Sequence, residues 1–195
     1  MFLGIDIGTS AVKVICTDGT AIHATATADL TVQSPHSGWS EQTPDAWWVA
    51  TCAALAEIAE TMPLSGVTGI GLSGQMHGAV LLDSAREVLR PAILWNDSRS
   101  TEDCARLQAA LPEIGSIAGV LPLPGFTAPK LMWVAREEPD VHARIAHILL
   151  PKDYIGLRLH GELATDRSDA AGTLWLDQAA RDWSHVVAEA SDTDP

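Results

Sequence analysis

The stretch Gly4-Ile5-Asp6-Ile7-Gly8-Thr9-Ser10-Ala11-Val12-Lys13 carries most of what this chain reveals about its fold. Asp6 stands in a short apolar strand, Gly8 allows a tight turn, and Lys13 stands in a β-branched strand that leads back. A carboxylate in a buried strand needs a partner, so we expect Asp6 to meet a metal ion, a water molecule or a ligand. Thr9 and Ser10 would add hydroxyls and backbone N–H groups at the same end. The pattern favours a hairpin that receives a magnesium-bound polyphosphate; an ordinary hairpin with solvated charges is the alternative.

Composition narrows the class of protein. The 195 residues include 12 basic and 25 acidic side chains, which gives a net charge of −13, and 47% of the residues are hydrophobic, which suffices for one sizeable core. So acidic a chain repels nucleic acids and anionic membranes. No apolar run approaches the roughly 18 residues that span a bilayer, and the start lacks the features of a signal peptide. We therefore expect a cytoplasmic protein that binds neither nucleic acid nor membrane.

The three cysteines, Cys16, Cys52 and Cys104, are widely spaced and include no Cys-x-x-Cys pair. This spacing indicates neither a disulfide framework nor a zinc site. We expect each cysteine to be a small buried hydrophobe.

The remaining sequence predicts an α/β domain. The turn signal Asp18-Gly19 and a third strand over 21–30 give a three-stranded antiparallel start. A helix begins after Thr43 and carries Trp47 and Trp48 as packing residues. Further strands are expected over 67–72, 79–83 and 93–95, and further helices over 100–110, 128–138, 141–146 and 152–159. Thr127 is the expected cap of the helix over 128–138. Together these elements predict a mixed five-stranded sheet flanked by helices.

Two strand ends carry polar residues, and strand ends are where α/β folds place ligands. The first is Gln75-Met76-His77-Gly78, and the second is Trp95-Asn96-Asp97-Ser98-Arg99. Met76, His77, Trp95 and Asp97 are therefore candidate ligand contacts. An ion pair between Asp97 and Arg99 that caps the following helix is an equally good interpretation of the second segment.

Several segments together resemble one family. The opening stretch is similar to the first phosphate loop of the sugar kinase, actin and hexokinase superfamily, which has the pattern Asp-x-Gly-Thr-Ser/Thr followed by a cation. The segment 125–137, with Lys130 and Trp133, resembles a signature of the FGGY carbohydrate kinases. The loop 75–78 resembles that of the branch acting on D-xylulose, where glycerol kinases have an Arg-Glu pair. The resemblance extends from residue 2 to about residue 183, with several motifs in the same order.

The resemblance implies an actin-like (ribonuclease H-like) ATPase domain and ATP-dependent phosphorylation of D-xylulose to xylulose 5-phosphate. It implies that Asp6 holds Mg²⁺ or its water shell and that Lys13 approaches the transferring phosphate. Contacts to the phosphate oxygens of ATP would come from Gly8, Thr9 and Ser10. Contacts to the ketose would come from Met76 and His77, with Trp95 and Asp97 as weaker candidates.

The chain also departs from the family pattern. Family members have two domains with the active site between them, and their catalytic base is an Asp in a Gly-Gly-Asp-Asn-type segment that residues 1–195 lack. We expect an N-terminal domain that is incomplete at its C-terminal end, inactive alone, and prone to self-association, in the simplest case as a homodimer. The alternatives are a related kinase for ribulose, gluconate or glycerol, and a truncated module that binds a sugar without phosphorylating it.

Overall fold

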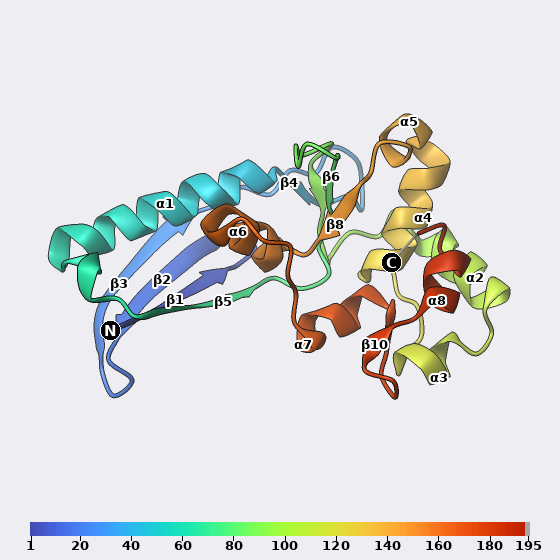
Figure 1. The fold of residues 1–195 in the computed structure, drawn as a ribbon. Coiled ribbons are helices and arrows are strands. Elements are labelled where there is room, and N and C mark those ends of the chain that lie inside the picture. The colour runs from blue at the N-terminus through green and yellow to red at the C-terminus, as the bar shows by residue number, and fades with distance from the viewer. Residues whose placement is uncertain (194–195) are drawn as a thin grey trace.

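A four-stranded sheet organises one half of the molecule in the computed structural model, which describes residues 1–193 (Figure 1). Its strand order is β3-β2-β1-β5, with β1 (Phe2–Ile7), β2 (Ala11–Thr17) and β3 (Ile22–Asp29) antiparallel and β5 (Gly69–Gly74) parallel to β1. The predicted antiparallel start is confirmed. The predicted five-stranded sheet is wrong, because the other described strands are short and form separate pairs.

Helix α1 (Pro44–Thr61) lies along one face of this sheet, with α6 (Pro151–His160) beside it (Figure 1). The expectation for the two tryptophans of α1 is confirmed: Trp47 is fully buried, and Trp48 packs against the same core. Alternate residues of β1 face these helices, as a strand's two-residue period requires: Leu3, Ile5 and Ile7.

The opposite face of the sheet is open. Asp6 of β1 and Lys13 of β2 stand directly opposite each other in the strand register, and both are exposed on this face. The expectation that Asp6 is buried is therefore wrong, because the apolar residues on either side of it all point to the other face. Its convergence with Lys13 is confirmed.

Three two-stranded pairs accompany the sheet in the described residues. Strand β4 (Glu41–Gln42) pairs with β7 (Ala92–Ile93), β6 (Val80–Leu82) with β8 (His147–Leu149), and β9 (Leu176–Asp177) with β10 (Asp182–Trp183). The helix expected over 141–146 is wrong: helix α5 ends at His142, and β8 follows, because pairing with β6 outweighs the local helical pattern.

A second apolar core lies at the other end of the molecule, where the shorter helices gather around α4 (Figure 1). These helices are α2 (Thr101–Ala110), α3 (Ile114–Ala118), α4 (Thr127–Glu137), α5 (Pro139–His142), α7 (Arg167–Ala170) and α8 (His185–Ala190), with the 3-10 turn η2 (Ala171–Thr173). The other 3-10 turn, η1 (Leu64–Gly66), follows α1 and packs against the core of the four-stranded sheet. None of the helices in residues 1–193 has the length and apolar character needed to cross a membrane. Only Cys16 of the three cysteines is buried; Cys52 is exposed and Cys104 partly so, which corrects the expectation for those two.

Strand β5 contains a glycine pattern that would mislead a motif search. Its sequence Gly69-Ile70-Gly71-Leu72-Ser73-Gly74 has the Gly-x-Gly-x-x-Gly spacing of a dinucleotide-binding turn. All six residues pair with β1 in a regular parallel ladder, however, rather than forming a turn between a strand and a helix. This run is therefore a structural strand.

Candidate functional site

The loop between β1 and β2 is the first part of the site. The backbone N–H of Gly8 donates to the carbonyl oxygen of Ala11 at 3.0 Å, and a Cβ on Gly8 would lie 2.8 Å from that oxygen, so only glycine closes the turn. The backbone N–H of Leu30 donates to the carbonyl of Ser10 at 2.8 Å. Hydrogen bonds to the start of β2 and to the residue after β3 thus hold the turn in place. Ser10 is exposed in it, and Thr9 is half-buried.

Asp6 stands beside this turn. Its Oδ1 accepts a hydrogen bond from the hydroxyl of Ser73 at 2.6 Å, and Lys13 lies opposite across the hairpin. Residues 1–193 contain no cluster of three or more acidic, histidine or cysteine side chains able to hold a metal ion. Magnesium in nucleotide sites keeps several waters and uses one or two carboxylates together with the phosphates, so a single exposed carboxylate fits that role.

Two buried glutamines join the turn to the rest of the site. The Thr9 hydroxyl donates to Oε1 of Gln75 at 3.0 Å, and Nε2 of Gln75 donates to Oε1 of Gln42 at 2.9 Å. Nε2 of Gln42 in turn donates to the backbone carbonyl of Thr9 at 2.8 Å, and Trp47 of α1 donates to Oε1 of Gln42 at 2.9 Å. We call Gln42 and Gln75 the glutamine bridge. It ties β4, α1 and the end of β5 to one residue of the turn.

The second polar strand end contacts the same turn. The indole Nε1 of Trp95 donates to the hydroxyl of Thr9 at 3.1 Å. Trp95 is 43% exposed and Met76, next to Gln75, is 49% exposed, although both are large apolar side chains. Trp95 lies beside the turn, and Met76 follows Gln75, which contacts it. Their exposed indole and thioether can pack against the C–H groups of a small ligand.

His77 follows Met76 in an unusual conformation. Its backbone is left-handed, with φ at 63°, and its ring meets the Phe126 ring edge-on at 4.8 Å between centroids. Nδ1 is buried without a hydrogen-bond partner in the described residues. Burial, with the nearby charge of Lys130, lowers the pKa of His77 to about 4, so the ring is neutral near pH 7. A neutral imidazole both donates and accepts hydrogen bonds, as a sugar hydroxyl requires.

Asp97 lies apart from this surface, in a buried ion pair. Its carboxylate accepts from the Arg99 guanidinium at 2.7 and 2.9 Å, from the Arg99 backbone N–H at 2.9 Å and from the Ser40 backbone N–H at 2.6 Å. Both oxygens are thus used within the protein. The structure confirms the ion pair but not its capping role, because the Asp97 carboxylate accepts from no backbone N–H of α2 in the described residues. The ion pair leaves neither oxygen of Asp97 free of protein partners.

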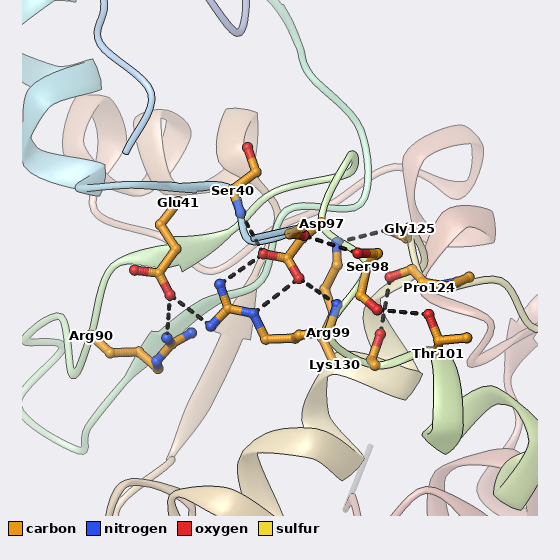
Figure 2. A network of polar contacts seen from close by, with 12 residues as sticks. Ser40, Glu41, Arg90, Asp97, Ser98, Arg99, Thr101, Pro124, Gly125 and Lys130 are labelled. Atoms are coloured by element: carbon orange, nitrogen blue, oxygen red, sulfur yellow. Dashed lines mark hydrogen bonds and ion pairs between the residues drawn. The ribbon is translucent and has the colours of Figure 1, made fainter. Parts of the chain in front are cut away.

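The ion pair belongs to a larger network between the two cores (Figure 2). Glu41 accepts from both Arg90 and Arg99 at 2.7 Å, and the Arg99 guanidinium lies 3.6 Å from the Trp39 ring centroid and 4.9 Å from that of Trp133. The Arg99 side chain is 1% exposed. This network fixes β4 against the segment that carries Trp95.

The structure brings some of the predicted residues together: Thr9 contacts Trp95, and Asp6 stands opposite Lys13. Asp97 lies apart, and Met76 and His77 follow Gln75 along the chain without a hydrogen bond to the turn in the described residues. The turn Gly8–Ser10, Trp95 and the start of the loop 75–78 meet directly through hydrogen bonds. Sequence reasoning missed the glutamine bridge, whose signal is one amide side chain at the end of β4 and another directly after β5. It also gave Thr127 the wrong role: Phe126 stands at the cap position of α4, and the Thr127 hydroxyl donates to the carbonyl of His77 at 3.2 Å.

Comparison with known proteins agrees with this arrangement. The family model described as "FGGY family of carbohydrate kinases, N-terminal domain" matches residues 1–195. The xylulose kinase of Escherichia coli K12 is 52% identical over 193 residues, which is 98% of this chain and 40% of that protein. The solved xyloylose kinase from Brucella ovis is 49% identical with a TM-score of 0.95, and the xylulose kinase from Rhodospirillum rubrum is 32% identical with the same TM-score.

These structures are matched over 98% and 99% of this chain and over 41% of their own chains. The chain thus spans about two fifths of the length of the relatives it matches. The family model matches this chain over the whole of its length, so the chain belongs to the FGGY family of carbohydrate kinases.

Proposed function

We propose that the full-length protein containing this chain transfers the terminal phosphoryl group of ATP to D-xylulose, giving ADP and xylulose 5-phosphate. The observation that carries the proposal is the meeting of two loops at one residue: Thr9 of the phosphate-loop turn is hydrogen-bonded both to Gln75, at the start of the loop 75–78, and to Trp95. A kinase needs its two substrates aligned, and this contact fixes the two half-sites relative to each other.

On the nucleotide side, the chain supplies donors and charges. Gly8, Thr9 and Ser10 contact the phosphate oxygens of ATP, and Lys13 neutralises charge on the transferring group. Asp6 holds Mg²⁺ or one of its waters, with Ser73 orienting the carboxylate. When bound, the ion neutralises the charge of the phosphates.

On the sugar side, Met76 and His77 bind the ketose, and Trp95 gives an apolar wall. Asp97 takes part through its ion pair, by holding the segment that carries Trp95. The base that accepts the proton of the attacking hydroxyl, and most of the adenosine pocket, belong to the second domain of the full-length protein. Residues 1–195 alone are therefore inactive as a kinase. A cytoplasmic location belongs to the same proposal.

The test is ADP formation by the full-length protein with D-xylulose, ribulose, gluconate and glycerol as acceptors. We expect the highest kcat/KM with D-xylulose. His77→Ala should raise the KM for D-xylulose or lower kcat while the melting temperature stays nearly unchanged, because its role is to contact the ligand. Preference for another acceptor would replace D-xylulose in the proposal, and sugar binding without any ADP formation would show a sugar-binding module instead.

A further inference from the structure

Lys130 is a charged residue that is completely buried (0% exposed), and neither the resemblance nor the proposed reaction gives it a role. It projects from α4 beneath the loop 75–78. Its Nζ donates to the carbonyl of His77 at 2.8 Å and to the carbonyl of Gly125 at 2.7 Å, and Figure 2 shows the second of these contacts. A buried lysine without a carboxylate in direct contact is costly, so its retention needs an explanation.

The contacts of Lys130 are made to backbone oxygens. Burial lowers the pKa of Lys130 to about 7, while the nearby charge of Asp97 opposes this shift and that of Arg99 adds to it. Nζ has two carbonyl acceptors within hydrogen-bond distance, those of His77 and Gly125. The amine therefore acts as a double hydrogen-bond donor that joins two loops, the one before α4 and the one that carries His77.

The second observation concerns the other end of His77. A Cβ placed on Gly172 of η2 would overlap Nδ1 and Cε1 of the His77 ring. Gly172 has no positive φ, so its backbone does not require glycine. The space left by the missing side chain is instead filled by the imidazole, which also meets Phe126 edge-on.

His77 is thus held at both ends. The hydrogen bonds of Lys130 and Thr127 to its carbonyl hold a backbone conformation that is unfavourable for a residue with a side chain. Gly172 and Phe126 fix the direction of its ring. We infer that Lys130 and Gly172 are positioning residues for sugar binding, which they support by setting the backbone and the ring orientation of His77. This inference rests on the proposed function, since it assigns His77 to the sugar.

The test is a double-mutant cycle in the full-length protein, with the Kd for D-xylulose measured by calorimetry and the KM for ATP by ADP formation. Gly172→Ala should raise the Kd for D-xylulose about tenfold or more, because the added methyl displaces the ring, and should leave the KM for ATP within about twofold. Lys130→Met keeps an unbranched side chain that reaches as far as Cε of lysine, removes the hydrogen bonds of Nζ to His77 and Gly125, and should raise the same Kd. Gly66→Ala is the control, since a Cβ there meets nothing within 4 Å.

The decisive comparison uses the His77→Ala background. If Gly172 acts through the imidazole, Gly172→Ala should change the Kd for D-xylulose by less than about twofold once the ring is gone. An equally large effect with and without the ring would overturn the inference, as would a Gly172→Ala protein with wild-type affinity.

Unchanged affinity in a folded Lys130→Met protein would overturn the part of the inference that concerns Lys130. If Lys130→Met does not fold, the Gly172 cycle still decides whether the orientation of the His77 ring matters. If the wild-type protein phosphorylates D-xylulose but the two substitutions are additive, this inference is wrong and the proposed function stands. If the wild-type protein does not bind D-xylulose, both this inference and the proposed function are wrong.

Discussion

Asp6 is a residue whose substitution should change the reaction without changing the stability of the fold. It is exposed on the open face of the sheet, opposite Lys13, and it accepts a hydrogen bond from Ser73 on the neighbouring strand β5. The fold therefore does not depend on its charge.

We predict that Asp6→Asn in the full-length protein lowers ATP-dependent turnover by about 100-fold or more, because the amide no longer attracts Mg²⁺. The affinity for D-xylulose and the melting temperature should stay close to the wild-type values. Glu57→Gln, on the exposed surface of α1, removes the same charge and should leave turnover unchanged. Wild-type turnover in Asp6→Asn would remove Asp6 from the site.

The buried ion pair of Asp97 and Arg99 leads to a stability prediction. Asp97→Ala leaves the Arg99 guanidinium, 1% exposed, without this partner, so we expect the free energy of unfolding to fall by about 3–5 kcal/mol. The control is Glu102→Ala, which breaks an exposed pair with Arg106 on α2 and should cost about 0–1 kcal/mol. Denaturant titration measures both values, and similar losses for the two variants would mean that burial does not set the strength of the Asp97 pair.

At the scale of elements, the glutamine bridge joins the turn between β1 and β2 to β4 and to the end of β5. Gln75→Leu should lower the free energy of unfolding by about 1–3 kcal/mol, because it removes two hydrogen bonds: the Thr9 hydroxyl loses its acceptor, and Oε1 of Gln42 loses one of its two donors. It should also raise the KM for both ATP and D-xylulose, since the bridge holds both half-sites.

The matched control for this prediction is Gln33→Leu. Gln33 is exposed, and its side chain makes no hydrogen bond within residues 1–193. A Gln75→Leu protein that loses affinity for one substrate only would show that the bridge supports one loop rather than both.

The sequence predicts the elements whose pattern is local. The hairpin of β1 and β2 follows from its turn residues, and α1 follows from its helical period and Pro44 in the first turn. Strands were expected near β6 and β7, but β4, β8 and the pairs β4–β7 and β6–β8 were not predicted. Strands of two or three residues have too short a pattern to identify them, and their pairing depends on partners far along the chain.

The candidate site also divides into residues that the sequence pattern indicates and residues that it does not. The turn Gly8–Ser10 and the loop 75–78 were recognisable, because glycine and polar residues after apolar strands stand out in a sequence. Lys130 was recognisable only as part of the segment that resembles the family signature, and its contacts were not predictable, since within α4 it has the pattern of an ordinary helical lysine. Nζ of Lys130 binds two backbone carbonyl groups, and because every residue has such a group, the sequence does not show which ones a lysine will contact.

At the scale of the whole molecule, the described chain leaves much apolar surface exposed. Phe2 on the open sheet face is 49% exposed, and Leu121 and Leu123, in the segment between α3 and α4, are 62% and 59% exposed. Exposed apolar groups of this size favour association. We predict that the isolated 195-residue chain self-associates, so that its weight-average mass in sedimentation rises with concentration. A constant monomer mass up to high concentration would contradict this.

The most direct test of the account compares ADP formation by the full-length protein and by the isolated 195-residue chain, each with MgATP and D-xylulose. In the proposed function, the contacts to phosphate and sugar lie in this chain, and the base and the adenosine pocket lie outside it. We therefore expect sugar-dependent ADP formation by the full-length protein and no measurable turnover by the chain alone, because loss of a positioned base by itself typically costs about 100- to 10,000-fold in rate. Turnover by the isolated chain at the rate of the full-length protein would contradict the account.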